Sequence, residues 1–216
     1  MSAVRGAGRG AVRRWRFGGD SALPAAVVSR GGVLAIPTES SYGLAADPRS
    51  VAGVEAIYRL KSRETGKPLP VVIAGVEQLA LVGVDPESPQ SRRAARCWPA
   101  ALTVVLPFAP GAPPLPAAAG GTSVAVRVPD HAELRALLAA TGPLTATSAN
   151  PAGGEPILDP AAVADLLAAA PDALLVDGGT LPGGPASTLV AFEGRRVRLL
   201  RPGRMPAERA IACLEG

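Results

Sequence analysis

The 216-residue sequence contains few residues of several chemically informative kinds. Its two cysteines, Cys97 and Cys213, match no CxxC spacing, so the sequence implies neither a disulfide scaffold nor a zinc site. Aromatic residues make up only 3% of the chain, which disfavours an RNA surface built on base stacking. No apolar run approaches the roughly 20 residues that a membrane-spanning helix needs. These shortages predict a soluble protein of a reducing compartment, the cytoplasm, with no membrane partner.

Charge is distributed unevenly along the chain. The formal net charge is +4, and residues 1–19 contain five arginines and no acidic residue. The remainder is nearly neutral, so the composition does not indicate a globally basic nucleic-acid binder. Because the first segment contains little serine and little apolar sequence, a flexible extension fits it better than a transit peptide. We expect residues 1–19 to be a basic flexible extension and residues 20–216 to be a single domain.

Apolar periodicity predicts strands that alternate with helices. The compact apolar run GGVLAIP predicts a buried strand, and apolar spacings of three and four predict an amphipathic helix over residues 49–61. Asp130 is the expected N-cap of a helix through Ala140. Further strands are expected at 69–75, 102–108, 123–129, 173–179, 187–192 and 197–203, and further helices at 23–29, 76–82, 89–97 and 159–170. This order predicts an α/β fold with a mixed sheet and packed helices.

Lysine and asparagine are nearly absent, and their few copies occur in two segments. Lys61 and Lys67 lie in KSRETGKPL, whereas the other twenty basic residues are arginines, and the single asparagine, Asn150, lies in TATSANPAGGEP. A compact ammonium and a planar guanidinium are not exchangeable where an anion must be held in one geometry. Chance placement of solvated charges is the alternative explanation. Both segments are therefore candidates for chemistry.

Four segments place hydroxyl groups or cations at the ends of expected elements. Ser40 follows a buried strand in PTESSYG, where hydroxyls and backbone N–H groups can hold a carboxylate or phosphate. KSRETGKP offers three cations within seven residues, which suits a triphosphate, although it lacks the P-loop spacing. Arg127 interrupts an apolar strand, so it must meet an acidic residue or an anionic ligand. Ser148 and Asn150 point the same way if their segment is extended. Each segment alone is also compatible with a turn or a structural ion pair.

Together these segments resemble the YrdC-like family of threonylcarbamoyl-AMP synthases in its short, single-domain form. The segments PTESSYGLAAD, KSRETGKPL, SVAVRVPDH, LTATSANPAGGEP, STLV and LLRPG occur in the family's order, from about Val33 to Gly203. The resemblance implies a twisted mixed β-sheet with flanking helices around a concave basic cleft. It also implies a catalytic set made of the family's Lys-x-Arg and Ser-x-Asn residues, here Lys61, Arg63, Ser148 and Asn150.

The resemblance implies a nucleotidyltransferase that joins L-threonine, bicarbonate and ATP into threonylcarbamoyl-AMP and releases pyrophosphate, with Mg²⁺ accompanying ATP. That product would serve threonylcarbamoyladenosine modification of tRNA beside the anticodon. The residues expected to bind threonine are Ser40, Arg127, Ala146 and Ser187. The residues expected to bind ATP are Arg63, Lys67, Ser123, Ser148 and Arg201. No metal ligand is expected from the protein itself.

Two residues depart from the family's pattern. Ser40 stands where the family usually has threonine, and Val72 stands where some members have a histidine that contacts the substrate threonine. The single histidine, His131, follows the expected N-cap and is not assigned a catalytic role.

Two other classes of function stay open on sequence grounds. One is a module that binds double-stranded RNA or tRNA without forming an adenylate. The other is carbamoyl transfer to a different acceptor, as in hydrogenase-maturation proteins with a YrdC-like domain, but those carry zinc-finger-like cysteine motifs that this chain lacks. The expected partners are small-molecule substrates and the downstream tRNA threonylcarbamoyl transferase machinery, with possible direct contact to RNA.

Overall fold

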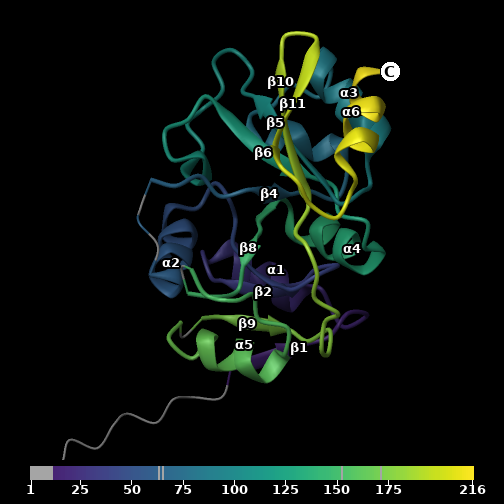
Figure 1. The fold of residues 1–216 in the computed structure, drawn as a ribbon. Helices are drawn as coiled ribbons and strands as arrows, with labels where there is room; N and C mark the ends of the chain where they lie inside the picture. Colours follow the sequence, from purple (N-terminus) through teal and green to yellow (C-terminus); the bar gives the residue numbers. More distant parts are fainter. Residues whose placement is uncertain (1–11, 63, 65, 152, 171) are drawn as a thin grey trace, which may run out of the picture.

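The computed structural model describes residues 12–62, 64, 66–151, 153–170 and 172–216, and its strands form two mixed sheets. One sheet has five strands in the order β1-β9-β2-β3-β8, and the other has six in the order β11-β10-β5-β6-β4-β7. The five-stranded sheet lies in the lower half of the molecule and the six-stranded sheet in the upper half (Figure 1). The α/β class with mixed sheets and flanking helices is confirmed, and the strands expected in one sheet divide between two.

Both sheets combine parallel and antiparallel pairs. In the five-stranded sheet β9 pairs in parallel with β1 and β2, whereas β3 pairs antiparallel with β2 and β8. In the six-stranded sheet β10 and β11 form an antiparallel hairpin joined by a turn at Gly194-Arg195. The strand bounds are β1 Arg13–Trp15, β2 Leu34–Pro37, β3 Tyr42–Ala45, β4 Val71–Val72, β5 Leu102–Pro107, β6 Ser123–Arg127, β7 Leu144–Thr145, β8 Thr147–Ser148, β9 Leu174–Val176, β10 Thr188–Glu193 and β11 Arg196–Arg201.

Four helices, α2, α3, α4 and α5, begin where a capping side chain accepts from one of the first free N–H groups. The Ser50 side chain accepts from Gly53 N at 3.2 Å, and Asp159 accepts from the first turn of α5. The N-cap of α4 is His131 and not the expected Asp130, because His131 has the extended backbone and its Nδ1 accepts from Leu134 N. The bounds are α1 Ala22–Ser29, α2 Val51–Lys61, α3 Pro89–Cys97, α4 Ala132–Thr141, α5 Pro160–Leu167 and α6 Ala207–Glu215, with 3-10 turns η1 Val76–Val82 and η2 Pro116–Ala118.

The chain crosses directly between the sheets at Ala146. Strand β7 before it pairs with β4 in the six-stranded sheet, and strand β8 after it pairs with β3 in the five-stranded sheet. The Ala146 N–H donates to Pro70 O at 2.8 Å, which satisfies the one backbone donor between the two short strands. This crossing places the ends of β3, β4 and β8 next to one another.

The N-terminal segment is ordered over part of the range expected to be flexible. Residues Arg13–Trp15 form β1, which pairs in parallel with β9. Trp15 packs against a buried apolar cluster that includes Leu34, Leu174 and Val176. Phe17 contacts His131, with 5.4 Å between the two ring centroids. The expectation of a flexible extension is therefore wrong for residues 13–17, because their partner strand lies some 160 positions away in sequence. Residues 1–11 lie outside the described residues.

A disulfide joins Cys97 at the end of α3 to Cys213 in α6, with a sequence separation of 116 residues. The sequence implied no disulfide scaffold, and the structure differs because the packing of α3 against α6 brings together two cysteines that lie far apart in the chain. Disulfides are uncommon in reducing compartments, so the cysteines no longer support a cytoplasmic location.

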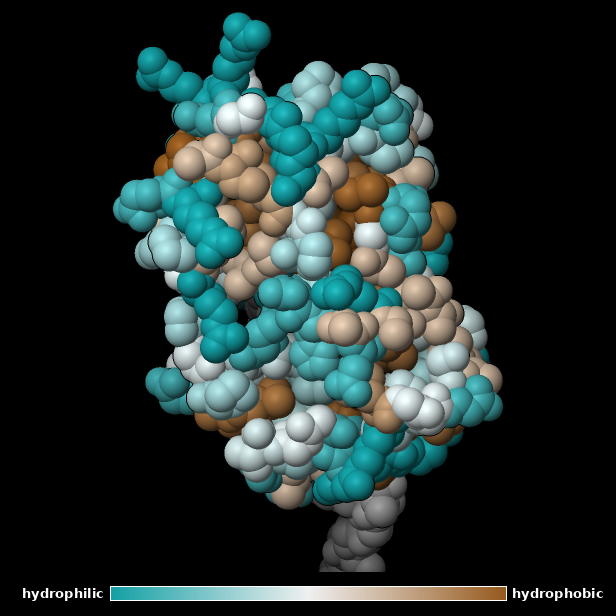
Figure 2. All heavy atoms as spheres, turned by 90° about the vertical axis from the view of Figure 1, so that its right-hand side faces the viewer, coloured by the Kyte–Doolittle hydropathy of each residue, from teal (hydrophilic) through white to brown (hydrophobic). Residues whose placement is uncertain are grey.

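The exposed face shown in Figure 2 alternates between hydrophilic areas and small apolar areas. Among the described residues, large apolar side chains that are at least 36% exposed come from α2, η1 and β11 and are Val51, Val76, Leu81, Leu199 and Leu200. Single exposed apolar residues are normal on folded proteins. Within the described residues no helix has the length and apolar character needed to cross a membrane.

Candidate functional site

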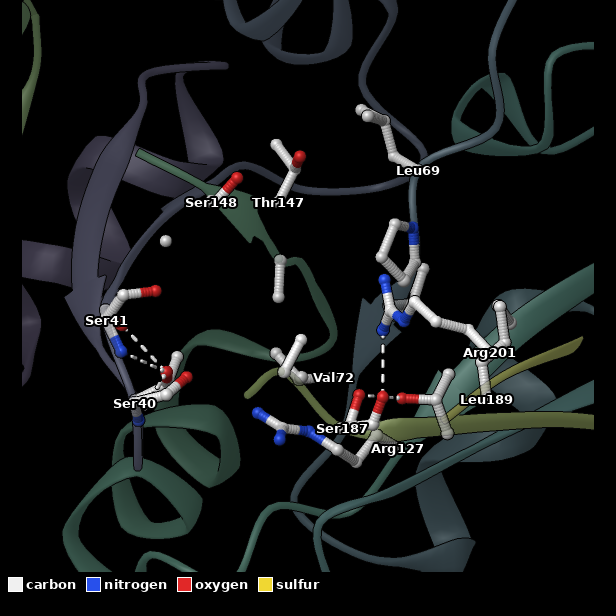
Figure 3. Close-up of a pocket in the computed structure, with 18 of the residues that line it drawn as sticks. Ser40, Ser41, Leu69, Val72, Arg127, Thr147, Ser148, Ser187, Leu189 and Arg201 are labelled. Atoms are coloured by element: carbon white, nitrogen blue, oxygen red, sulfur yellow. Dashed lines mark hydrogen bonds between the residues drawn. The ribbon is translucent and has the colours of Figure 1, made fainter. Parts of the chain in front are cut away.

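A cavity of about 500 Å³ lies where the two sheets meet. Its walls come from the loop before β3, from β4 and the segment before it, from β6, and from the β7–β8 crossing. The start of β10 and the end of β11 complete it. In Figure 3 the labelled side chains of these segments surround a common space. A volume of this size is typical of small-molecule sites.

The cavity gathers the four residues expected on the threonine side. Ser40, Arg127, Ala146 and Ser187 all line it, although they lie in four different segments of the chain. Ser148 and Arg201, two of the residues expected to bind ATP, line it as well. The structure therefore brings together six of the expected site residues.

The loop that carries Ser40 is held in a tight turn by a neighbouring hydroxyl. Thr38 Oγ1 donates to Ser41 O at 2.7 Å and lies 3.4 Å from the backbone nitrogens of Ser40 and Ser41. The Ser40 carbonyl accepts from Gly183 N at 2.9 Å. These bonds use the backbone of the turn, so the turn itself presents the Ser40 side chain to the cavity (Figure 3).

Arg127 is buried at the end of β6, and its charge is compensated by Glu39. Arg127 Nη2 lies 3.2 Å from Glu39 Oε2, and the two side chains are only 11% and 12% exposed. Burial lowers the pKa of Arg127, the nearby Glu39 carboxylate opposes that change, and the charge of Arg201 adds to it. Arg127 was predicted to meet either an acidic residue or an anionic ligand, and the acidic residue is confirmed as Glu39. The guanidinium still lines the cavity, where its other N–H donors can face an anion.

Ser187 and Arg201 form the part of the wall contributed by the late hairpin. Ser187 Oγ lies 2.7 Å from Thr103 Oγ1, and Arg201 Nη2 donates to Ser187 O at 2.9 Å (Figure 3). Beyond β11, Gly203 approaches the backbone of residues 186–188 so closely that a Cβ there would lie 2.3 Å from Ala186 O. Glycine at this position therefore allows the segment after Arg201 to close against the cavity wall.

Lys61 lies inside the protein and does not line the cavity. Lys61 is the last residue of α2 and is only 4% exposed. Lys61 Nζ donates to the carbonyl oxygens of Ser148 and Asn150, the latter at 2.8 Å, and to Asn150 Oδ1 at 3.2 Å. The ammonium thus holds the backbone next to Ser148, a cavity residue. Lys61 and Asn150, both expected in the catalytic set, form a buried polar cluster behind the cavity wall, and their catalytic role stays a prediction.

The remaining expected residues are not among the described residues that line the cavity. Lys67 is exposed, and its Nζ lies 3.0 Å from Glu64 Oε2. The hydrogen bond from Lys67 is the main reason why the pKa of Glu64 lies below its usual range. Ser123 begins β6, at the opposite end of the strand from Arg127. Arg63 lies outside the described residues. Their expected contacts with ATP stay predictions.

Apolar residues also line the cavity. Val72, at the position where some family members have histidine, is 2% exposed and lies near Arg127 and Ser187, whereas Leu69 lies away from them, beyond Arg201 (Figure 3). Among the described residues that line the cavity none is Asp or Glu. No group of three or more His, Cys, Asp or Glu in the described part of the chain is placed to hold a metal ion.

Sequence reasoning did not identify Glu39 and Thr103 as part of the site. Glu39 could have been found, because it lies in the same PTESSYG loop as Ser40 and the buried Arg127 required an acidic partner. Thr103 had no such signal, because a threonine in the apolar strand β5 is ordinary and its contact with Ser187 depends on strand pairing.

Comparison with known proteins identifies the fold and the family. The family model of Sua5, YciO and YrdC, described as telomere recombination, matches residues 26–203. The threonylcarbamoyl-AMP synthase of Bacillus subtilis is 37% identical over 195 residues, 89% of this chain and 56% of that protein. The threonylcarbamoyl-AMP synthase of Marinobacter nauticus is 44% identical over 137 residues, 62% of this chain and 72% of that protein.

The fold agrees with a solved structure of the same family. The crystal structure of P. abyssi Sua5 complexed with L-threonine has a TM-score of 0.80 and 29% identity, covering 94% of this chain and 60% of that chain. This chain thus spans little more than half the length of the Bacillus and P. abyssi relatives. With a family model that matches most of its residues, the chain belongs to the Sua5, YciO and YrdC family.

Proposed function

We propose that this chain forms threonylcarbamoyl-AMP and pyrophosphate from L-threonine, bicarbonate and ATP. The observation that carries the proposal is the cavity between the two sheets, which gathers the expected threonine residues with Ser148 and Arg201. The names of the relatives and the threonine complex of P. abyssi Sua5 support it. We further propose that the product passes to tRNA threonylcarbamoyl transferase machinery, which modifies the adenosine beside the anticodon.

Each side of the cavity offers groups that suit one substrate. On the threonine side, Arg127 would face the substrate carboxylate, Ser40 and Ser187 would offer hydroxyls, and Ala146 would contribute its backbone. Val72 would contact the substrate methyl group. The ATP side would be formed by Arg63, Lys67, Ser123, Ser148 and Arg201.

The reaction requires two anions to meet. The threonine ammonium first loses a proton, and the resulting amine combines with bicarbonate to an N-carboxylate as water leaves. A carboxylate oxygen then attacks the α-phosphorus of ATP. The bond from that phosphorus to the bridging oxygen breaks, and its electron pair leaves with pyrophosphate. Fixed guanidinium groups such as Arg127 and Arg201 would hold the anions together and stabilise the developing charge. Mg²⁺ would arrive with ATP and neutralise the pyrophosphate oxygens.

The direct test measures pyrophosphate release from ATP, with the product identified by mass. We expect release only when threonine, bicarbonate and Mg²⁺ are all present. Serine should be a poorer substrate by about tenfold or more, because loss of one methyl contact changes binding by about 1–3 kcal/mol. Equal turnover with serine would contradict the threonine assignment. RNA binding without any amino-acid-dependent pyrophosphate release would favour a binding module instead.

A further inference from the structure

Glu39 contributes a buried carboxylate directly behind the cavity wall. It lies in the loop between β2 and β3, next to Ser40, and its Oε1 accepts from Asp130 N at 3.0 Å. Its other oxygen, Oε2, is fully buried and makes no hydrogen bond with any described atom, while Arg127 Nη2 lies 3.2 Å away. The guanidinium is therefore the charge partner of Oε2. Because Oε2 is closed to the cavity, Glu39 is not placed to accept a proton from a substrate.

The backbone of Glu39 also contacts the segment that follows β11. Its carbonyl oxygen accepts from Arg204 Nη1 at 2.8 Å, and Arg204 N donates to Ala186 O at 2.8 Å. Arg204 follows β11, which carries Arg201, and Ala186 precedes Ser187 in the cavity wall. Glu39, in a loop of the five-stranded sheet, thus contacts two segments of the six-stranded sheet, Arg127 at the end of β6 and Arg204 just after β11.

We propose that Glu39 is a positioning residue for threonine binding, whose carboxylate orients the Arg127 guanidinium toward the cavity. The proposal rests on the proposed function. A guanidinium has five N–H donors in one plane, so fixing Nη2 on a buried carboxylate determines where the remaining donors point. A free guanidinium at this depth would instead turn toward any available acceptor, because an uncompensated buried charge is costly.

Glu39→Gln removes the charge while keeping the shape of the side chain. An amide has one acceptor oxygen and one donor nitrogen, whereas Glu39 offers acceptors to both Asp130 N and Arg127 Nη2. Either orientation of the amide therefore sets its NH₂ group against another donor. The guanidinium must move away from it, and the cavity loses the orientation of Arg127.

The test compares Glu39→Gln with Asp47→Asn, a matched control. Asp47 also forms an ion pair with an arginine, at 2.8 Å to Arg49 Nη2, but it does not line the cavity and contacts none of the Glu39 partners named above. Calorimetry with L-threonine alone and with ATP alone gives the two dissociation constants. For Glu39→Gln we expect the threonine constant to rise about tenfold or more and the ATP constant to stay within about twofold. For Asp47→Asn we expect both constants to stay within about twofold of wild type.

A second comparison asks whether Glu39 acts through Arg127. Adding Glu39→Gln to Arg127→Lys should weaken threonine binding little beyond the loss caused by Arg127→Lys alone. If Glu39→Gln does not fold, Glu39→Asp serves, because it keeps the charge but withdraws it by about one bond length, 1.5 Å. We expect it to weaken threonine binding while leaving ATP binding unchanged.

Several results would overturn the proposal. Wild-type threonine affinity in a folded Glu39→Gln, or an equal loss of threonine and ATP affinity, would show a merely structural role. Fully additive losses in the double variant would show that Glu39 acts independently of Arg127. In each of these cases wild-type protein still binds threonine and releases pyrophosphate, so the proposed function stands. Failure of wild-type protein to bind threonine would instead remove the proposed function and this inference with it.

Discussion

The buried ammonium of Lys61 provides the sharpest test of the structure, because the other lysine of the chain is its natural control. Lys61→Met keeps most of the aliphatic stem and removes the charge that contacts three oxygens of Ser148 and Asn150. Lys67→Met removes an ammonium that is 59% exposed and paired with Glu64 on the surface. The two substitutions are chemically identical, so any difference between them arises from burial and contacts.

The expected cost follows from the number of buried acceptors that lose their donor. Each hydrogen bond to a charged group contributes about 1.5–3 kcal/mol, and the three bonds share one ammonium, so their contributions do not simply add. Removing one member of a buried charged network costs about 3–5 kcal/mol, and we expect Lys61→Met to fall in that range. For a chain of this size that lowers Tm by about 10 °C. Lys67→Met should change Tm by no more than about 2 °C, because an exposed ion pair between neighbouring residues contributes little to stability.

Thermal unfolding followed by circular dichroism measures both variants, and the pyrophosphate assay at a temperature where both are folded measures their activity. We expect Lys61→Met to lower kcat, because the Ser148 backbone loses its anchor. Lys67→Met should raise the KM for ATP while leaving stability unchanged. A Lys61→Met protein that melts within about 2 °C of wild type would refute the reasoning, since it would mean that the ammonium does not stabilise the crossing segment.

Three further outcomes test other parts of the structure. The double variant Cys97→Ser/Cys213→Ser should unfold at lower temperature, with a loss of about 2–5 kcal/mol, and wild type treated with a thiol reductant should move to the same Tm. Trp15→Ala should lower the free energy of unfolding by about 1–3 kcal/mol in urea titrations, and Trp15→Phe should lower it less. An unchanged free energy of unfolding in Trp15→Ala would mean that residues 13–17 do not pack on the domain. The Gly179 N–H bond, assisted by two arginines, holds the pKa of Asp177 below its ordinary value of 3.8. Its stabilising contribution is therefore present above that value and is lost as pH falls through the lower folded-state pKa, so Asp177→Asn should flatten the acid limb of a stability-versus-pH curve.

Local patterns were sufficient for elements whose residues specify their own conformation. The helix expected over residues 49–61 forms from Val51 to Lys61, and α3 has the bounds Pro89–Cys97 that Pro89 and the Trp98-Pro99 sequence indicated. The apolar spacing, the capping serines and the prolines of these segments act within one or two turns, so they can be read along the chain. The N-cap of α4 was missed because aspartate is a preferred capping residue and histidine is not, whereas the backbone of the preceding loop places His131 at the capping position.

Many of the residues that form the candidate site could be predicted from the sequence, whereas their arrangement in space could not. Six of its expected residues line one cavity, because their motifs lie at strand ends that the two sheets bring together. The burial of Lys61 could not be inferred, since lysine is usually exposed and its burial here depends on contact with Ser148 and Asn150, which lie more than 80 positions away in the chain.

By itself, the sequence determined the helices, most strands and the need of Arg127 for an acidic residue or an anionic ligand. These depend on periodicity, capping and the cost of burying an unpaired charge, all of which act on a residue and its near neighbours. The motif residues in their order were supplied by the resemblance to a known family. Only the tertiary structure decided the division into two sheets, the β1–β9 pair, the disulfide between α3 and α6, and the choice of Glu39 as that partner. Each of these is a contact between residues far apart in the chain, and such contacts form only when packing of the whole core brings the segments together.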